Sequence, residues 1–185
     1  DGTATDTDSF YGAGKWPTTG DRMARYKRDA PHLALSAIEA LDPDIANAGI
    51  THIIVASCTG FMAPGLDQVI VERAGLDPAV ERTVVGFMGC YAAVNSLRLA
   101  HHIVRSTPDA RVLVVTLELC TLHFQETNDL QKLLSMLIFA DGAAAALVTS
   151  HAEGIALDDF RAVAIGDTAQ AISWDIGDQG FDMHL

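Results

Sequence analysis

Cys90 is the residue of this sequence that is best placed for nucleophilic chemistry. It follows a β-rich run, residues 82–87, and precedes an alanine-rich amphipathic stretch, residues 91–105. We expect a strand that ends at Cys90 and turns directly into a helix, so that the sulfur lies at the helix N-terminus. The free N–H groups and the macrodipole of that terminus favour an anion, and the thiolate is the reactive form of cysteine. The alternative is an inert buried cysteine, since free cysteine is among the most buried residue types. Local sequence leaves both interpretations open.

Other patterns that carry chemistry are weaker or missing. The cysteines Cys58, Cys90 and Cys120 are odd in number and show neither C-x-x-C spacing nor a paired cysteine and histidine pattern. We therefore expect no disulfide framework and no metal site, and a reducing cytoplasm suits such thiols. The sequence has no G-x-x-x-x-G-K-[ST] loop, no G-x-G-x-x-G after a strand and no G-x-S-x-G elbow. Nucleotide binding and serine hydrolase chemistry thus have no support.

Composition bounds the class of protein. A chain of 185 residues with 49% hydrophobic content is long enough to bury a substantial core in about one domain. Its net charge of −12 argues against nucleic acid as a partner, because affinity for phosphate backbones comes mainly from Lys and Arg. The longest apolar runs, such as residues 143–148, are far shorter than the roughly 20 residues of a membrane span. We expect a globular protein with no span.

The elements that must position Cys90 alternate between helix and strand. Residues 1–20 are rich in Gly, Thr, Asp and Pro and predict an irregular lead-in. The expected helices are 23–41, 66–74, 91–105 and 130–139, and the expected strands are 51–57, 82–87, 111–119 and 143–149. The run 51–57 is continuously apolar and β-branched, as in a strand buried on both faces. This alternation predicts a mostly parallel sheet covered by helices, with the last strand pairing to another across a turn at Glu153-Gly154.

Four blocks of the sequence carry a resemblance to a known family: Ala56 to Asp67, Gly89 to Ala93, Arg111 to Val115 followed by Glu118, and Phe139 to Ala145. In this order and at these separations, they resemble the N-terminal part of a type III polyketide synthase of the chalcone and stilbene synthase family, and specifically a bacterial member. The resemblance implies an α/β, thiolase-like fold, of which this chain is the N-terminal half: a mostly parallel mixed sheet covered by helices. We divide the chain into the lead-in 1–20, a thiolase-like domain 21–150, and 151–185 as the start of a connection toward a C-terminal half absent from this sequence.

The resemblance also implies a reaction. Cys90 would take an acyl group from a CoA thioester, and malonyl-CoA would be decarboxylated to a carbanion that extends it to a polyketide of pyrone, resorcinol or phloroglucinol type. Acyl-CoA and malonyl-CoA are then substrates, with no cofactor, and the full-length protein would be a homodimer. The histidine and asparagine that stabilise oxyanions in this family have no match here, and its CoA-binding basic residues fall outside this sequence. We therefore expect an incomplete segment that is inactive alone.

Further site residues carry over from the resemblance. Phe139 matches the gatekeeper phenylalanine between the CoA tunnel and the cavity, and Met183 falls where the family has a second gatekeeper aromatic. Cys58 and Glu118 align with positions that influence cyclisation. Cys120 and His123 align with cavity-lining positions, at which plant enzymes commonly have threonine. Ala63 takes the place of a methionine that reaches into the partner's cavity, and a small residue there would leave room for a long acyl starter.

Two alternatives belong to other classes. A ketoacyl synthase III-type enzyme shares a cysteine at a helix start but would take an acyl carrier protein, and the blocks Pro64 to Asp67 and Phe139 to Ala145 favour the polyketide synthase. A structural or binding half-domain with an inert Cys90 is the non-enzymatic interpretation.

Overall fold

The core of the protein is one four-stranded mixed sheet. The computed structural model describes residues 10–12, 14–169 and 171–184. The strands are β1 (His52–Ser57), β2 (Glu81–Gly86), β3 (Val112–Leu119) and β4 (Asp141–Val148), in the order β2-β1-β3-β4. β1 is parallel to both β2 and β3, whereas β4 is antiparallel to β3. The predicted mostly parallel sheet is therefore confirmed.

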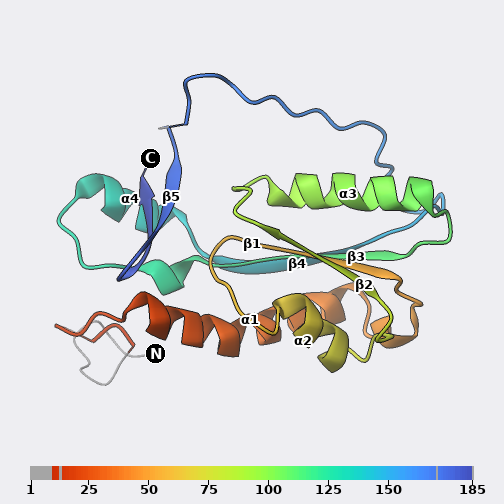
Figure 1. Ribbon diagram of the computed structural model, residues 1–185, viewed down its shortest axis with the longest axis horizontal. Helices are drawn as coiled ribbons and strands as arrows, with labels where there is room; N and C mark the ends of the chain where they lie inside the picture. The colour runs from red at the N-terminus through yellow and green to blue at the C-terminus, as the bar shows by residue number, and fades with distance from the viewer. Residues whose placement is uncertain (1–9, 13, 170, 185) are drawn as a thin grey trace.

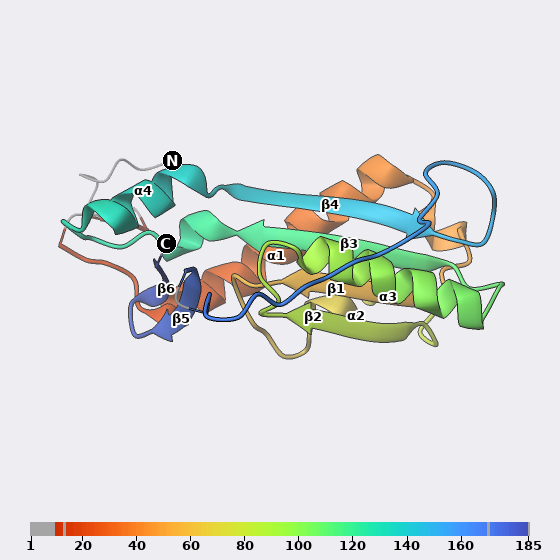
Figure 2. The same ribbon diagram turned by 90° about the horizontal axis from the view of Figure 1, so that it is seen from above.

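Helices cover both faces of this sheet. The helices α1 (Thr19–Leu41) and α2 (Leu66–Arg73) lie on one face, and α3 (Ala92–Ser106) lies on the other (Figures 1 and 2). Successive residues of β1 point to opposite faces, so Ile53 and Val55 pack in the α1 and α2 layer while Ile54 packs with Ala100 of α3. This two-sided burial explains why β1 has a continuous apolar run rather than an alternating one. Among the described residues, no helix combines the length and the apolar character needed to cross a membrane.

α1 begins earlier than the sequence pattern predicted. Thr18 caps it, because its Oγ1 accepts a hydrogen bond from the N–H of Asp21 (3.2 Å) and the Asp21 carboxylate accepts one from the N–H of Thr18 (2.9 Å). This capping box starts the helix at Thr19, inside the predicted lead-in 1–20. Residues 1–9 of that lead-in lie outside the described residues.

The chain after β4 differs from the prediction. β4 does not pair across Glu153-Gly154; it pairs with β3, with Val148 opposite Val112, and the described residues of 151–169 contain no strand. The connection between β3 and β4 contains a 3₁₀ turn, η2 (Cys120–His123), and a helix, α4 (Leu130–Ile138), which together reverse the chain onto β3. A hairpin of β5 (Ser173–Gly177) and β6 (Gly180–His184) then forms within 151–185, where only a connection was predicted.

This hairpin returns to the end of the sheet where α1 begins (Figure 1). The N–H of Thr19 donates to the carbonyl of Asp178 (2.9 Å), and the N–H of Gly180 donates to Thr19 Oγ1 (2.8 Å). The fully buried Arg22 donates to the carbonyls of Pro17 and Leu122, and so joins α1 to η2. Gly180 has a positive φ of 117°, and a Cβ there would lie 2.9 Å from Arg22 Nε. Glycine is therefore required where the hairpin crosses α1.

Gly60, in the turn after β1, tests how tightly α1 packs on the sheet. A Cβ at this position would overlap the ring of Tyr26, which is buried in α1 and donates a hydrogen bond to Ser57 Oγ (2.7 Å). We expect Gly60→Ala to lower the free energy of unfolding by about 1 to 3 kcal/mol, as overpacking does. The measurement is urea unfolding followed by circular dichroism. Gly166→Ala, where a Cβ would meet nothing within 4 Å, is the matched control and should change stability little. Equal stability of the two variants would contradict the packing described.

Candidate active site

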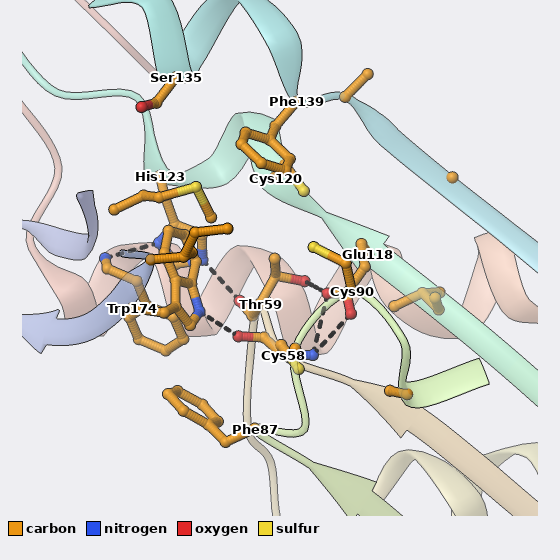
Figure 3. A pocket seen from close by; sticks show the side chains of 18 of the residues that line it. Cys58, Thr59, Phe87, Cys90, Glu118, Cys120, His123, Ser135, Phe139 and Trp174 are labelled. Carbon is orange, nitrogen blue, oxygen red and sulfur yellow. Dashed lines mark hydrogen bonds between the residues drawn. The ribbon is translucent and has the colours of Figure 1, made fainter. Parts of the chain in front are cut away.

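A pocket of about 890 Å³ opens at the carboxyl ends of the parallel strands. The carboxyl edge is where α/β sheets place their sites, because the loops that follow parallel strands converge there. All of the predicted site residues except Ala63 line it: Cys58, Cys90, Glu118, Cys120, His123, Phe139 and Met183 (Figure 3). Ala63 is exposed in the turn after β1 and does not line the pocket of its own chain.

Cys90 lies in the loop between β2 and α3. The predicted strand does not reach it: β2 ends at Gly86, and Phe87 and Gly89 adopt positive φ angles of 50° and 72°, which a strand does not permit. α3 begins two residues after Cys90, at Ala92, and no side chain caps its first N–H groups. The Cys90 thiol is exposed in the pocket rather than buried. Cys90 is therefore not a buried core cysteine.

Cys58 lies beside the Cys90 loop. Burial raises the pKa of the Cys58 thiol, and the nearby Glu118 carboxylate raises it further, whereas the backbone N–H groups of residues 87–89 point at the sulfur and lower it in part. The Cys58 side chain thus lies against the loop that carries Cys90. Its environment favours the thiol rather than the thiolate.

Glu118 ties the end of β3 to the turn after β1. Its carboxylate accepts hydrogen bonds from the N–H of Cys58 (2.9 and 3.0 Å) and from Thr59 Oγ1 (2.7 Å). Thr59 Oγ1 in turn accepts from the N–H of Leu119 (2.8 Å). Burial raises the pKa of Glu118 although these hydrogen bonds oppose the shift. The carboxyl group is therefore held in one place.

The far wall of the pocket comes from η2, α4 and the residues before β4. Burial, the Glu118 carboxylate and Asp141 raise the pKa of the Cys120 thiol to about 12. Asp141 accepts hydrogen bonds from the N–H and Oγ1 of Thr121 (2.8 and 2.6 Å), which fixes η2 against the start of β4. Phe139, the C-cap of α4, lies beside this junction and points into the pocket (Figure 3).

Two aromatic residues that line this site, Trp174 and Phe181, were not predicted from the sequence. Both belong to the β5–β6 hairpin and line the pocket, as does Met183. Trp174 Nε1 donates to the carbonyl of Cys58 (2.7 Å), across 116 residues of sequence. The signal that could have found them is the turn sequence Gly177-Asp178-Gln179-Gly180 between two short runs that contain β-formers.

His123 connects that hairpin to the turn after β1. Its Nε2 hydrogen-bonds the carbonyl of Thr59 (2.7 Å), and its Nδ1 accepts from the N–H of Phe181 (2.9 Å). Burial is the main cause that lowers the pKa of His123 to about 4, and the positive charge of Arg22 adds to it. The imidazole is therefore neutral at pH 7 and is occupied at both nitrogens.

Cysteine labelling tests the different environments of the three thiols. Iodoacetamide at pH 8 should label Cys90 first, since it is exposed, and Cys120 last, since burial and nearby carboxylates raise its pKa to about 12. Peptide mass spectrometry over time gives the three rates, and Cys90→Ala, in which Cys58 and Cys120 should stay slow, is the control. Labelling of Cys120 ahead of Cys90 would contradict the site.

The buried His123 also predicts a pH dependence of stability. Between about pH 4 and 6.5 the unfolded chain binds a proton at His123 that the folded chain does not, so the free energy of unfolding falls as the pH falls through this range. The loss is up to about 3 kcal/mol and levels off below pH 4. Urea unfolding at several pH values should show a shallower slope for His123→Gln. The exposed His32→Gln should keep the wild-type slope, and a wild-type slope in His123→Gln would refute the assignment.

Residues 17–152 match the family model of chalcone and stilbene synthases, N-terminal domain. A curated relative, the "Alpha-pyrone synthesis polyketide synthase-like Pks18" of Mycobacterium tuberculosis, is 38% identical over 135 residues, which are 71% of this chain and 34% of that protein. The 1,3,6,8-tetrahydroxynaphthalene synthase of Streptomyces coelicolor is 31% identical over 173 residues, covering 91% of this chain and 46% of that protein.

Similarity to solved structures supports the same family. The crystal structure of PKS-I from the brown alga Ectocarpus siliculosus superposes with a TM-score of 0.85 at 30% identity, covering 92% of this chain and 47% of that one. The chain spans less than half the length of the relatives named here. The shared fold and the match over residues 17–152 show that the chain belongs to the chalcone and stilbene synthase family of type III polyketide synthases, with their thiolase-like fold.

Proposed function

We propose that this chain supplies the nucleophile and one side of the cavity of a polyketide-forming condensing enzyme, with Cys90 as the residue that carries the acyl chain. The observation that supports this most strongly is the position of Cys90: its thiol is exposed in a pocket of about 890 Å³, two residues before the uncapped N-terminus of α3. That terminus favours negative charge on the sulfur and on an oxyanion formed beside it.

The proposed chemistry has two stages. The Cys90 thiolate attacks the carbonyl carbon of an acyl-CoA, a C–S bond forms, and CoA leaves as its thiol after taking up a proton. Malonyl-CoA then loses CO₂, and the resulting carbanion attacks the Cys90 thioester, which forms a C–C bond and releases the cysteine thiolate. A covalent intermediate divides a difficult condensation into two easier steps. CoA thioesters are the substrates, no cofactor takes part, and the free thiol suits the reducing cytoplasm.

Other residues of the pocket shape this reaction. We assign Phe139 and Met183 to the gate, since Phe139 follows α4 as its C-cap, Met183 belongs to β6, and both lie at the wall of the pocket. The half-buried Cys58 and Cys120 are held as thiols by their raised pKa values, so we assign them to the cavity wall and not to acyl transfer. We assign Glu118, whose carboxylate is fixed by Cys58 and Thr59, a role in cyclisation.

The product belongs, in this proposal, to the pyrone, resorcinol or phloroglucinol type. The names of two relatives mention alpha-pyrone synthesis and 1,3,6,8-tetrahydroxynaphthalene, and the first of these supports the pyrone type. The family resemblance calls for a histidine and an asparagine as oxyanion donors. The described residues that line the pocket include no asparagine, and their histidine, His123, already has both ring nitrogens engaged. Removal of one such donor costs roughly 2.7 to 4 kcal/mol of transition-state stabilisation, so we expect the pocket described here to support little condensation by itself.

The working protein is, we propose, a homodimer. β2 is an edge strand with an exposed N-terminal portion, and large apolar side chains are exposed next to it. They are Phe61, Val84, Phe87, Met88, Tyr91 and Val94. A second copy would cover this patch and bring its Ala63 turn near the site, since Ala63 follows Phe61 closely and is itself exposed.

The acylation of Cys90 can be measured separately from the condensation with malonyl-CoA. Incubation of the chain with a medium-chain acyl-CoA should add one acyl group, detected by intact and peptide mass spectrometry on Cys90, slowly and at most stoichiometrically. Further addition of malonyl-CoA should yield no pyrone or resorcinol, because we expect the pocket to have no free oxyanion donors. Cys90→Ser should abolish loading, whereas Cys58→Ser should retain it. Acylation of Cys58 in place of Cys90, or product formation by this chain alone, would overturn the proposal.

A further inference from the structure

The β5–β6 hairpin needs contacts with the rest of the fold to keep its position as a wall of the pocket. A two-stranded hairpin is at best marginally stable alone, and the described residues between β4 and β5 form no helix or strand that would carry it. Its position therefore depends on bonds to the rest of the fold. These bonds come from Thr19 of α1, Lys132 of α4, Gln125, His123 of η2 and the turn after β1.

His123 forms hydrogen bonds with both the hairpin and the turn after β1 through the two nitrogens of its ring. Its Nδ1 receives the N–H of Phe181, and its Nε2 lies 2.7 Å from the carbonyl of Thr59. A carbonyl only accepts and a backbone N–H only donates, so the proton must be on Nε2 and the lone pair on Nδ1. Each nitrogen is thereby committed to one partner, in one tautomer.

The ring of His123 also packs in the hairpin's aromatic cluster. It stacks on Phe181 with centroids 4.2 Å apart and planes inclined by 15°, and it meets Trp174 edge-on with centroids 5.4 Å apart. Trp174 then bonds the carbonyl of Cys58, the residue before Thr59 (Figure 3). Two consecutive carbonyls of the β1 turn thus hold the hairpin, one through His123 and the other through Trp174.

We propose that His123 is a positioning residue: as the neutral Nε2–H tautomer it fastens the β5–β6 hairpin to the turn after β1, and so fixes Trp174 and Met183 as a wall of the pocket. It is neither an acid nor a base in the folded protein, since both nitrogens are engaged and only 4% of its surface is exposed. Its importance for polyketide chemistry rests on the function proposed above, but the fastening itself does not.

Two substitutions divide the bonds of His123 between them. His123→Asn keeps an acceptor near the position of Nδ1, and His123→Gln keeps a donor near the position of Nε2, whereas His123→Leu keeps neither. The variants are made in Trp16→Phe, so that fluorescence reports Trp174 alone, since the chain has two tryptophans. Amide hydrogen exchange of Phe181 by NMR reports the Nδ1 bond, and Trp174 emission reports the aromatic cluster.

The Phe181 amide should exchange about tenfold faster in His123→Leu and His123→Gln than in wild type, the effect of one lost hydrogen bond, and His123→Asn should restore most of the protection. Trp174 emission should shift to the red in His123→Leu. The ¹⁵N imidazole spectrum of the wild type should show the Nε2–H tautomer at pH 7.

An Nδ1–H tautomer or an imidazolium at pH 7, or equal Phe181 exchange in wild type and His123→Leu, would overturn the proposal. The imidazole spectrum needs no substitution, so the test survives a variant that fails to fold. Because no readout involves acyl transfer, failure of Cys90 loading would refute the proposed function and leave this inference standing.

Discussion

The rest of the site depends on the hydrogen bonds of the half-buried Glu118 carboxylate. Desolvation works against it, as its raised pKa shows, and three hydrogen bonds from Cys58 and Thr59 compensate for the loss of water. These bonds lock the turn after β1 onto the end of β3. They also orient the carbonyls of Cys58 and Thr59, which form hydrogen bonds with Trp174 and His123.

A second constraint acts on the loop that carries Cys90. Positive φ angles at Phe87 and Gly89 turn the chain out of β2, and the sulfur of Cys58 lies near the backbone N–H groups of that turn. The Cys90 thiol is consequently directed into the pocket at the start of α3, and the two neighbouring thiols stay protonated in partly buried positions. Three cysteines in one pocket thus have different chemistry because their solvation differs.

Local patterns predicted much of the framework. The continuous apolar run of β1 required a strand covered on both faces, and the alternation of strands and helices required a mostly parallel sheet, which is the sheet observed. The errors have local physical causes as well. The Thr18–Asp21 capping box extended α1 backward, the φ angles of the Cys90 loop ended β2 early, and β4 found its partner in β3 rather than across Glu153-Gly154.

By itself, the sequence determined the order of the main helices and strands from α1 to β4, the family, and Cys90 as the candidate nucleophile before α3, because propensity, periodicity and motif spacing are local properties of the chain. Only the tertiary structure decided what surrounds that cysteine. The contacts of Glu118 with Cys58, of His123 with Phe181 and of Trp174 with Cys58 join residues 60, 58 and 116 positions apart. Such pairs follow from strand order and from the return of the hairpin, which no local pattern specifies. They give Cys58, Cys120 and His123 the burial and the neighbours that set their protonation states.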